Sequence, residues 1–145
     1  KYIAPSTTIN FPNLEKIADT SSNGIELSTF KSFSIPKLQE LPKLNLSIES
    51  VDGIGDFDIN PNLQIDTLEI QSSKLFDQPW NSKTDKQVFL KNTLSGNKEL
   101  LTKLKEIFKH SDRISISQYE NSKESDKLVL TKDEVQKILE EAGIE

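Results

Sequence analysis

The amino-acid sequence predicts an α+β fold in which a β-rich N-terminal half packs with a C-terminal helix–hairpin–helix unit. Apolar residues alternate with polar ones in short runs before Trp80 and recur at helical spacing after it. Charge divides at the same place, because residues 1–80 carry six Lys against eleven Asp or Glu, whereas residues 81–145 carry twelve basic and twelve acidic residues. A chain of 145 residues has the length of a single domain. We therefore expect one domain, with a β-rich acidic part (1–80) and an α/β part (81–145).

Short strands are predicted throughout the first part. Leu44, Leu46 and Ile48 alternate with polar residues, which is the period of a strand with one buried face. The change of phase between Ile65 and Leu68 predicts a bulge, a bend or the start of a new strand. A sheet meander with antiparallel or mixed pairing is one arrangement that satisfies this pattern. The same alternation recurs in shorter pieces at Ile25/Leu27, Phe57/Ile59, Leu63/Ile65 and Leu68/Ile70.

Two amphipathic helices are predicted in the second part. The first covers residues 97–109 and the second residues 132–142. A capping box begins at Thr131, and Gly143 is placed to end the second helix in a left-handed conformation. The apolar stripe of the first helix is Leu100, Leu101, Leu104, Ile107 and Phe108, and that of the second is Val135, Ile138, Leu139 and Ala142.

A hairpin is predicted between these two helices. The alternating pairs Ile114/Ile116 and Leu128/Leu130 flank a polar turn at residues 120–126. A further short helix is predicted near residues 86–92, and residues 77–82 form the connection between the two parts.

A Pro-x-Leu motif recurs along the first part. It stands at Pro12, Pro36 and Pro61, at spacings of 24 and 25 residues. The two stretches that follow the second and third motifs match L-x-x-L-x-L-x-x-N-x-L, with Glu49 or Ser73 at the Asn position. Over residues 11–76 the chain therefore resembles a leucine-rich repeat. The resemblance implies a short stack of parallel strands, which is the alternative to the meander. The residues that coincide at a shift of 24 are Leu41, Leu44, Leu46 and Val51 with Ile65, Leu68, Ile70 and Leu75.

The composition argues against an enzyme. The chain has no Cys, which excludes thiolate metal sites and cysteine nucleophiles, and its single histidine is His110. His110 directly follows the first helical stripe, where a histidine stabilises the carbonyl end of a helix or lies at the surface. No phosphate-binding loop and no nucleophile motif is present. We therefore expect no catalytic residue and no cofactor.

One acidic segment has a spacing that a cation site would use. Asp52, Asp56, Asp58 and Asn60 place oxygen ligands at alternating positions, and hard cations such as calcium bind oxygen. Pro61 stands where a calcium-binding loop has its glycine, however, and no glutamate closes the loop. The other interpretation is a strand whose solvated face carries these side chains, so no metal site is predicted.

A binding protein is the class that remains. Basic residues are densest over residues 98–113, but acidic residues interrupt them, so no nucleic-acid partner is predicted. No apolar run is long enough to span a bilayer. Trp80 either contacts a partner or fills the junction between the two parts. We expect a non-enzymatic protein-interaction module that binds another protein. The alternative is a carrier for a small ligand or lipid, with an apolar pocket in the β half.

The N-terminus bears on where such a module would act. The chain begins at Lys1 and contains no Met, so it is a trimmed piece of a longer product. Removal of an export signal would account for this and favours a secreted, surface or virion-type assembly. Trimming of a longer chain at another boundary accounts for it equally well.

Overall fold

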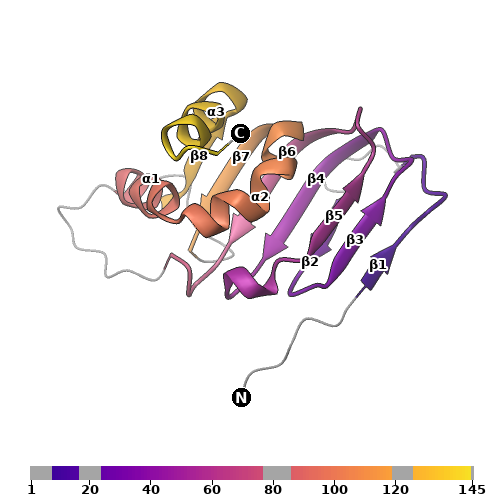
Figure 1. Cartoon of the computed structure of the whole chain (residues 1–145), viewed down its shortest axis with the longest axis horizontal. Coiled ribbons are helices and arrows are strands. Elements are labelled where there is room, and N and C mark those ends of the chain that lie inside the picture. Colours follow the sequence, from indigo (N-terminus) through magenta and orange to yellow (C-terminus); the bar gives the residue numbers. More distant parts are fainter. Residues whose placement is uncertain (1–7, 17–23, 77–85, 119–125, 145) are drawn as a thin grey trace, which may run out of the picture.

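A computed structural model describes residues 8–16, 24–76, 86–118 and 126–144 of the chain. The described elements are eight strands, three α-helices and one short 3₁₀ helix (Figure 1). The strands are β1 (Thr8–Asn10), β2 (Ile25–Leu27), β3 (Ser32–Ile35), β4 (Glu40–Ser47), β5 (Asp56–Ile59), β6 (Gln64–Gln71), β7 (Ser111–Ser117) and β8 (Leu128–Thr131). The helices are η1 (Val51–Gly53), α1 (Lys86–Gly96), α2 (Lys98–His110) and α3 (Lys132–Glu141). The predicted α+β class is confirmed.

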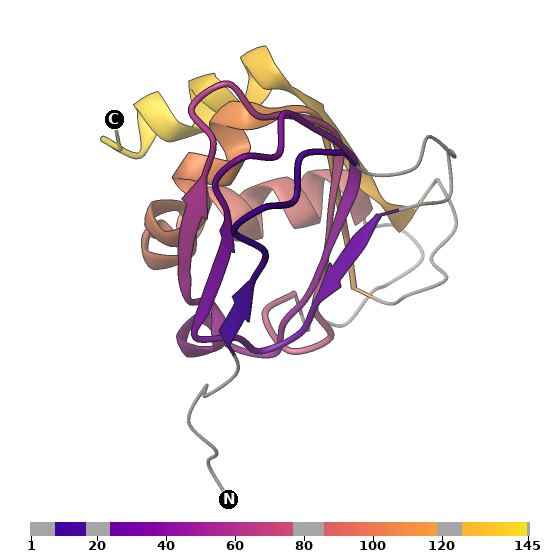
Figure 2. The same ribbon diagram turned by 90° about the vertical axis from the view of Figure 1, so that its right-hand side faces the viewer.

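The strands form two sheets that face each other (Figure 2). The smaller sheet has the order β1-β3-β5, and the larger has the order β2-β4-β6-β7-β8. Every pair of neighbouring strands is parallel except β7 and β8, which are antiparallel. Successive strands alternate between the two sheets up to β6, so the chain winds in three coils, each of which crosses both sheets once.

The parallel pairing corrects the meander interpretation of the first part. Leu44 pairs with Leu68 and Leu46 with Ile70, so β6 repeats β4 at a distance of 24 residues along the chain. β5 repeats β3 at the same distance, since Phe33 pairs with Phe57. Alternating polarity is common to parallel and antiparallel strands with one covered face, and for this reason the alternation alone did not distinguish the two arrangements.

The three Pro-x-Leu motifs form equivalent turns. In each turn the leucine N–H donates to the carbonyl three residues earlier: Leu14 to Phe11 (3.3 Å), Leu38 to Ile35 (3.3 Å) and Leu63 to Asn60 (2.9 Å). Proline lies at the second position of each turn, where its fixed φ is already correct. These turns connect the smaller sheet to the larger one in all three coils.

The hydrophobic core runs between the two sheets as columns of stacked apolar side chains. Leu44 and Leu68 are fully buried in one column, which continues through Ile114 of β7. The change of phase between Ile65 and Leu68 is a bend within β6, because both residues are buried and the strand is continuous. β4 has the same bend between Leu41 and Leu44, so the register is kept.

The C-terminal unit has the predicted order of helix, hairpin and helix. α2 buries the predicted stripe against the sheet, and β7 pairs with β8 as a hairpin. α3 begins with the predicted capping box at Thr131, in which Glu134 N–H donates to the threonine hydroxyl and the Glu134 carboxylate accepts from Thr131 N–H. It ends at Gly143, which has a φ of 76°, and the Ile144 N–H donates to Leu139 O at 2.8 Å. α1 is longer than the predicted segment 86–92.

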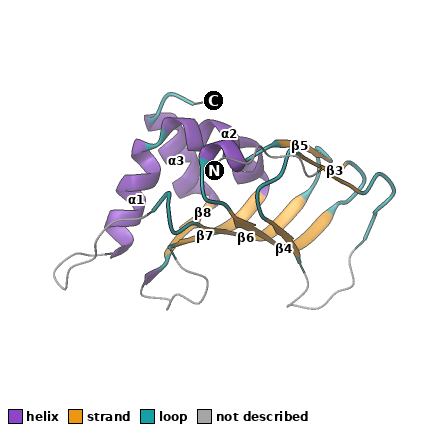
Figure 3. Cartoon of the chain, turned by 90° about the horizontal axis from the view of Figure 1, so that it is seen from below, coloured by secondary structure: helices purple, strands orange, loops and turns teal. Residues whose placement is uncertain are grey.

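The boundary drawn at Trp80 divides the sequence pattern but not the larger sheet. β6 lies before this boundary and β7 after it, yet the two strands pair along six residue pairs from Ile65–Ser111 to Gln71–Ser117. The inner face of the larger sheet is covered by the smaller sheet over β2 and β4 and by the three helices over its other half (Figures 1 and 3). No described helix has both the length and the apolar character that a membrane crossing requires.

Candidate functional site

The outer side of the five-stranded sheet is the largest polar feature that the fold builds. It faces away from the helices and from the smaller sheet, and we call it the open face (Figure 3). Alternate residues of each strand point to it, while their neighbours, such as Leu44 and Leu46, point into the core. The open face is lined by Glu26, Ser28, Lys43, Asn45, Ser47, Glu69, Gln71, Ser115, Ser117 and Lys127.

The strand register arranges these side chains in rows that cross the strands. The pairings Glu26 with Asn45, Asn45 with Glu69 and Glu69 with Ser115 place these residues side by side on four neighbouring strands. A second row contains Ser47, Gln71 and Ser117 on β4, β6 and β7. Residues 91 positions apart in the sequence, Glu26 and Ser117, thus line one surface.

A hollow of about 470 Å³ lies on the open face. β7 contributes only the short side chains of Ser115 and Ser117 here, which are 7% and 8% exposed. β6 contributes the longer side chains of Glu69 and Gln71. The small residues therefore form a floor beside taller neighbours. The hollow is lined mainly by polar atoms and is open to solvent, so among the described residues it differs from an enclosed apolar ligand pocket.

The charges on the open face balance. Lys43 Nζ lies 3.4 Å from Glu69 Oε1, and both side chains are about one-third exposed. An ion pair this exposed contributes little to folding stability, typically up to about 1 kcal/mol. Glu26 and Lys127 are the other charged lining residues. A partner with charges of both signs is complementary to such a surface.

Asn45 lies at the centre of the first row. Its side-chain oxygen Oδ1 is buried and has no hydrogen-bond partner among the described residues. The neighbours across the strands are Glu26 and Glu69, whose carboxylates accept hydrogen bonds but cannot donate them when ionised. A buried acceptor without a partner destabilises the folded state by about 1–3 kcal/mol. The open face thus carries a polar group that its own sheet does not satisfy.

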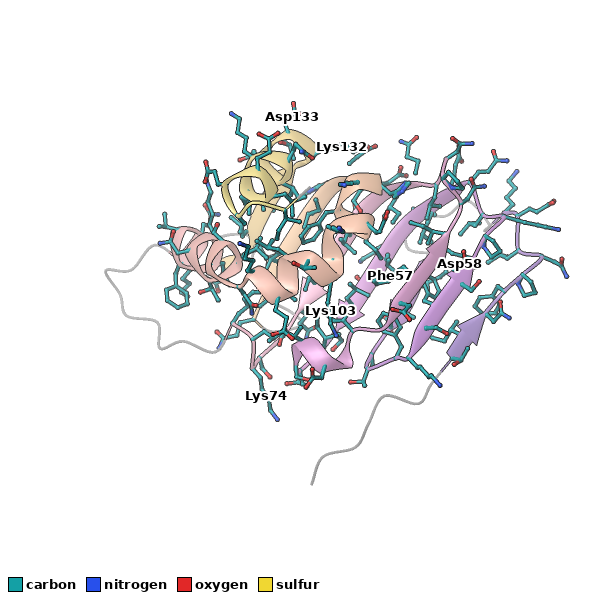
Figure 4. All side chains as sticks on the ribbon, viewed as in Figure 1. Phe57, Asp58, Lys74, Lys103, Lys132 and Asp133 are labelled. Carbon is teal, nitrogen blue, oxygen red and sulfur yellow. The ribbon has the colours of Figure 1, made fainter. Side chains whose placement is uncertain are left out.

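The acidic segment forms a strand and a turn. Asp56 and Asp58 point outward from β5, while Phe57 is half-buried and its ring contacts the ring of Phe30 at a centroid distance of 5.2 Å (Figure 4). Ser34 Oγ donates to Asp58 Oδ2 at 2.8 Å. Asn60 Oδ1 accepts from the N–H of Asn62 within the third Pro-x-Leu turn. Asp52 lies in η1.

These acidic residues do not converge on a common centre. No group of three or more His, Cys, Asp or Glu side chains suited to holding a metal ion occurs among the described residues.

His110 connects the helical part to the third coil. Its ring nitrogen Nδ1 lies 2.9 Å from the carbonyl oxygen of Leu63 and acts as the donor. Asp112, two residues later, accepts from Gln64 Nε2 at 2.9 Å and lies 3.7 Å from Lys132 Nζ. His110 ends α2, and no nucleophile is hydrogen-bonded to its ring in the described part of the chain. Trp80, the candidate contact residue, lies outside the described residues.

Sequence reasoning identified the strands of the open face but not the surface itself. The polar residues at alternate positions were interpreted only as the solvated sides of separate strands. The signal that could have assembled them was the shift of 24 residues, which superimposes Asn45 on Glu69 and Ser47 on Gln71. β7 follows β6 only after two helices, and no local pattern marks it as the next strand of the same sheet.

Comparison with known proteins does not add a second source of evidence. The chain matches no protein family, no curated protein and no solved structure at a significant level. Functional conclusions therefore rest on the geometry of the open face.

Proposed function

We propose that the protein is a non-enzymatic protein-interaction module and that it binds its partner on the open face. The observation that carries this proposal is the uncovered, polar side of a five-stranded sheet, with its hollow of about 470 Å³. We further propose that the first three coils are a leucine-rich-repeat-like stack, and that the module belongs to a secreted, surface or virion-type assembly.

The chemistry of the open face favours a protein as the ligand. Its hydroxyl, amide, carboxylate and ammonium groups both donate and accept hydrogen bonds, as peptide groups and polar side chains do. Two Glu and two Lys balance each other, whereas a nucleic-acid site needs an excess of positive charge. The side chains stand on paired strands, which hold them in place before the partner arrives.

The carrier hypothesis has less support. A lipid or small apolar ligand needs an enclosed apolar cavity. Between the two sheets the side chains of Phe33, Ile35 and Leu44 are fully buried and pack in columns, and the hollow of the described part is polar and open. Native mass spectrometry separates the two hypotheses, because a carrier would retain a co-purified small molecule.

Site-specific photocrosslinking tests the proposed contact surface. A photoreactive residue such as benzoylphenylalanine replaces Ser47 on the open face, and in a matched control it replaces Lys137 on the solvent side of α3. Both positions are exposed. In cells that make the protein, we expect a crosslinked band of discrete mass from position 47 and none from position 137. The band should be lost when Glu69→Lys is added. The same bands from both positions, or none from position 47, would exclude the open face as the contact surface.

A further inference from the structure

The first coil of the stack is less buried than the equivalent positions of the second coil. Ile9 of β1 pairs with Phe33 of β3, yet Ile9 is half-buried while Phe33 is fully buried. Ile25 of β2 pairs with Leu44 of β4, and again the first residue is half-buried and the second fully buried. Phe11, which follows β1, is 45% exposed. These apolar side chains are exposed at the end of the stack, where the next coil would lie.

The backbone at this end also presents strand edges. β1 has only β3 as a neighbour and β2 has only β4 among the described strands. The Phe11 N–H donates to Ser34 O at 2.9 Å, toward β3. Because successive peptide groups of a strand point to opposite sides, the N–H and C=O of Asn10 point away from β3. Such unpaired edges are templates for pairing with another strand.

The opposite end of the stack is closed by the chain itself. α2 lies beside the third coil, where Lys103 Nζ donates to Ile54 O at 3.4 Å and His110 contacts the Leu63 carbonyl at 2.9 Å (Figures 1 and 4). The larger sheet continues through β7 and ends at β8, which is antiparallel to it. The two ends therefore differ, and only the end at β1 and β2 offers two open edges together (Figure 2).

We propose that this end is a dimer interface and that its occupant is a second copy of the same chain. To pair with both edges at once, a partner must present two strand edges at the same separation, one for each sheet. A second copy related by a two-fold axis meets this condition by symmetry. β1 then pairs antiparallel with the partner's β1, and β2 with the partner's β2, so both sheets continue across the interface. Because the other end is closed, the assembly stops at two copies.

The side chains at this end fit such a contact in their apolar part and oppose it at one rim. Ile9, Phe11, Leu14 and Ile25 meet their counterparts in the partner and lose their exposed area. Glu26, in the middle of β2, points to the open face, and the two-fold axis brings it close to its own copy. Like charges that face each other across strands destabilise their pairing. The dimer should therefore be weak at low ionic strength and tighter in salt.

Sedimentation equilibrium of the full 145-residue chain over a range of concentrations tests the interface. We expect a monomer–dimer equilibrium with no larger species. Phe11→Lys should weaken the dimer at least about tenfold, because it places a charge in the apolar contact. It alters an exposed side chain, so the fold should persist. Ile25→Lys is a second variant at the other sheet. Val129→Lys on β8 is the matched control, since it adds the same charge at the far edge of the larger sheet and should leave the equilibrium unchanged.

Glu26→Gln provides a variant with the opposite sign. It removes the like-charge contact and should tighten the dimer by up to about fivefold. A purely monomeric chain at all concentrations would overturn the proposal, and so would a dimer that Phe11→Lys and Ile25→Lys leave intact. Hydrogen exchange adds an independent measurement, because the Asn10 amide should be protected at high protein concentration and exposed on dilution. A monomer in which this amide is already protected would show that residues 1–7 cover the end, which also contradicts a dimer.

Discussion

Gly55 lies where two turns of the chain approach each other most closely. A Cβ at this position would overlap the carbonyl oxygen of Lys31, and its φ is not positive, so close backbone approach and not an unusual conformation requires the glycine. We expect Gly55→Ala to lower the free energy of unfolding by about 1–3 kcal/mol, as overpacked sites do. Urea denaturation followed by circular dichroism measures this change.

Gly96 is the matched control for that substitution. It ends α1, and a Cβ there would meet no atom within 4 Å. Alanine loses less backbone entropy on folding than glycine, so Gly96→Ala should raise the free energy of unfolding by up to about 1 kcal/mol. If both variants changed stability by the same amount, close approach at Gly55 would not be the cause.

Asn45 combines a stability defect with a place on the candidate site. Because its buried Oδ1 has no partner, replacing the amide with an apolar side chain of similar size removes an unsatisfied group. We expect Asn45→Val to raise the free energy of unfolding by about 1 kcal/mol and to weaken partner crosslinking at position 47. Ser47→Val on the exposed part of the same strand should change stability by less than about 0.5 kcal/mol. A destabilised Asn45→Val protein would show that the amide is satisfied in solution.

At the scale of whole elements, stability should rise from the end of the stack toward its centre. Ile25 and Leu44 belong to one column, but only Leu44 has a neighbour on each side. Leu44→Ala should lower the free energy of unfolding by about 2–5 kcal/mol. Ile25→Ala should cost less than half as much, because its side chain is already partly in water. The pair is compared by urea denaturation at a concentration low enough to keep the chain monomeric, and equal losses would contradict the gradient.

The sequence predicted individual elements better than it predicted their neighbours. α2 and α3 follow from residues that contact each other within one or two helical turns, and the capping box at Thr131 is a contact over three residues. The strand pairings join residues 19 to 46 positions apart, as in Ile25–Leu44 and Leu68–Ile114. Polarity patterns carry no information on which strand pairs with which. Only the 24-residue recurrence of Pro-x-Leu did so, and it ends at Pro61.

The candidate site was less predictable than the elements. Asn45 and Glu69 are ordinary surface residues in the sequence, and they become neighbours only because β4 and β6 pair in parallel. The acidic segment attracted attention because its residues are adjacent in sequence. Alternation along β5 instead spreads them along one side of a strand, with Phe57 between Asp56 and Asp58 on the other side.

Over the whole molecule, this placement makes calcium an ordinary salt. Asp56 and Asp58 are exposed on one face of β5, and Asp58 accepts a hydrogen bond from Ser34. We expect millimolar calcium chloride to change the melting temperature no more than sodium chloride does at matched ionic strength. Differential scanning fluorimetry with both salts measures the difference. A shift of several degrees that is specific to calcium and is lost in Asp58→Ala would instead identify a bound ion.

The regular winding of the coils has a consequence for how such a chain can lengthen. Each coil contacts only the coils beside it, and consecutive copies superimpose at 24 residues. A tandem duplication of the segment from Pro36 to Ile59 would add one strand to each sheet, and every new strand would find neighbours of the geometry that it already has. The helical cap would be carried along unchanged. Gene duplication and slippage could therefore enlarge the open face one strand at a time, without any need to redesign the ends.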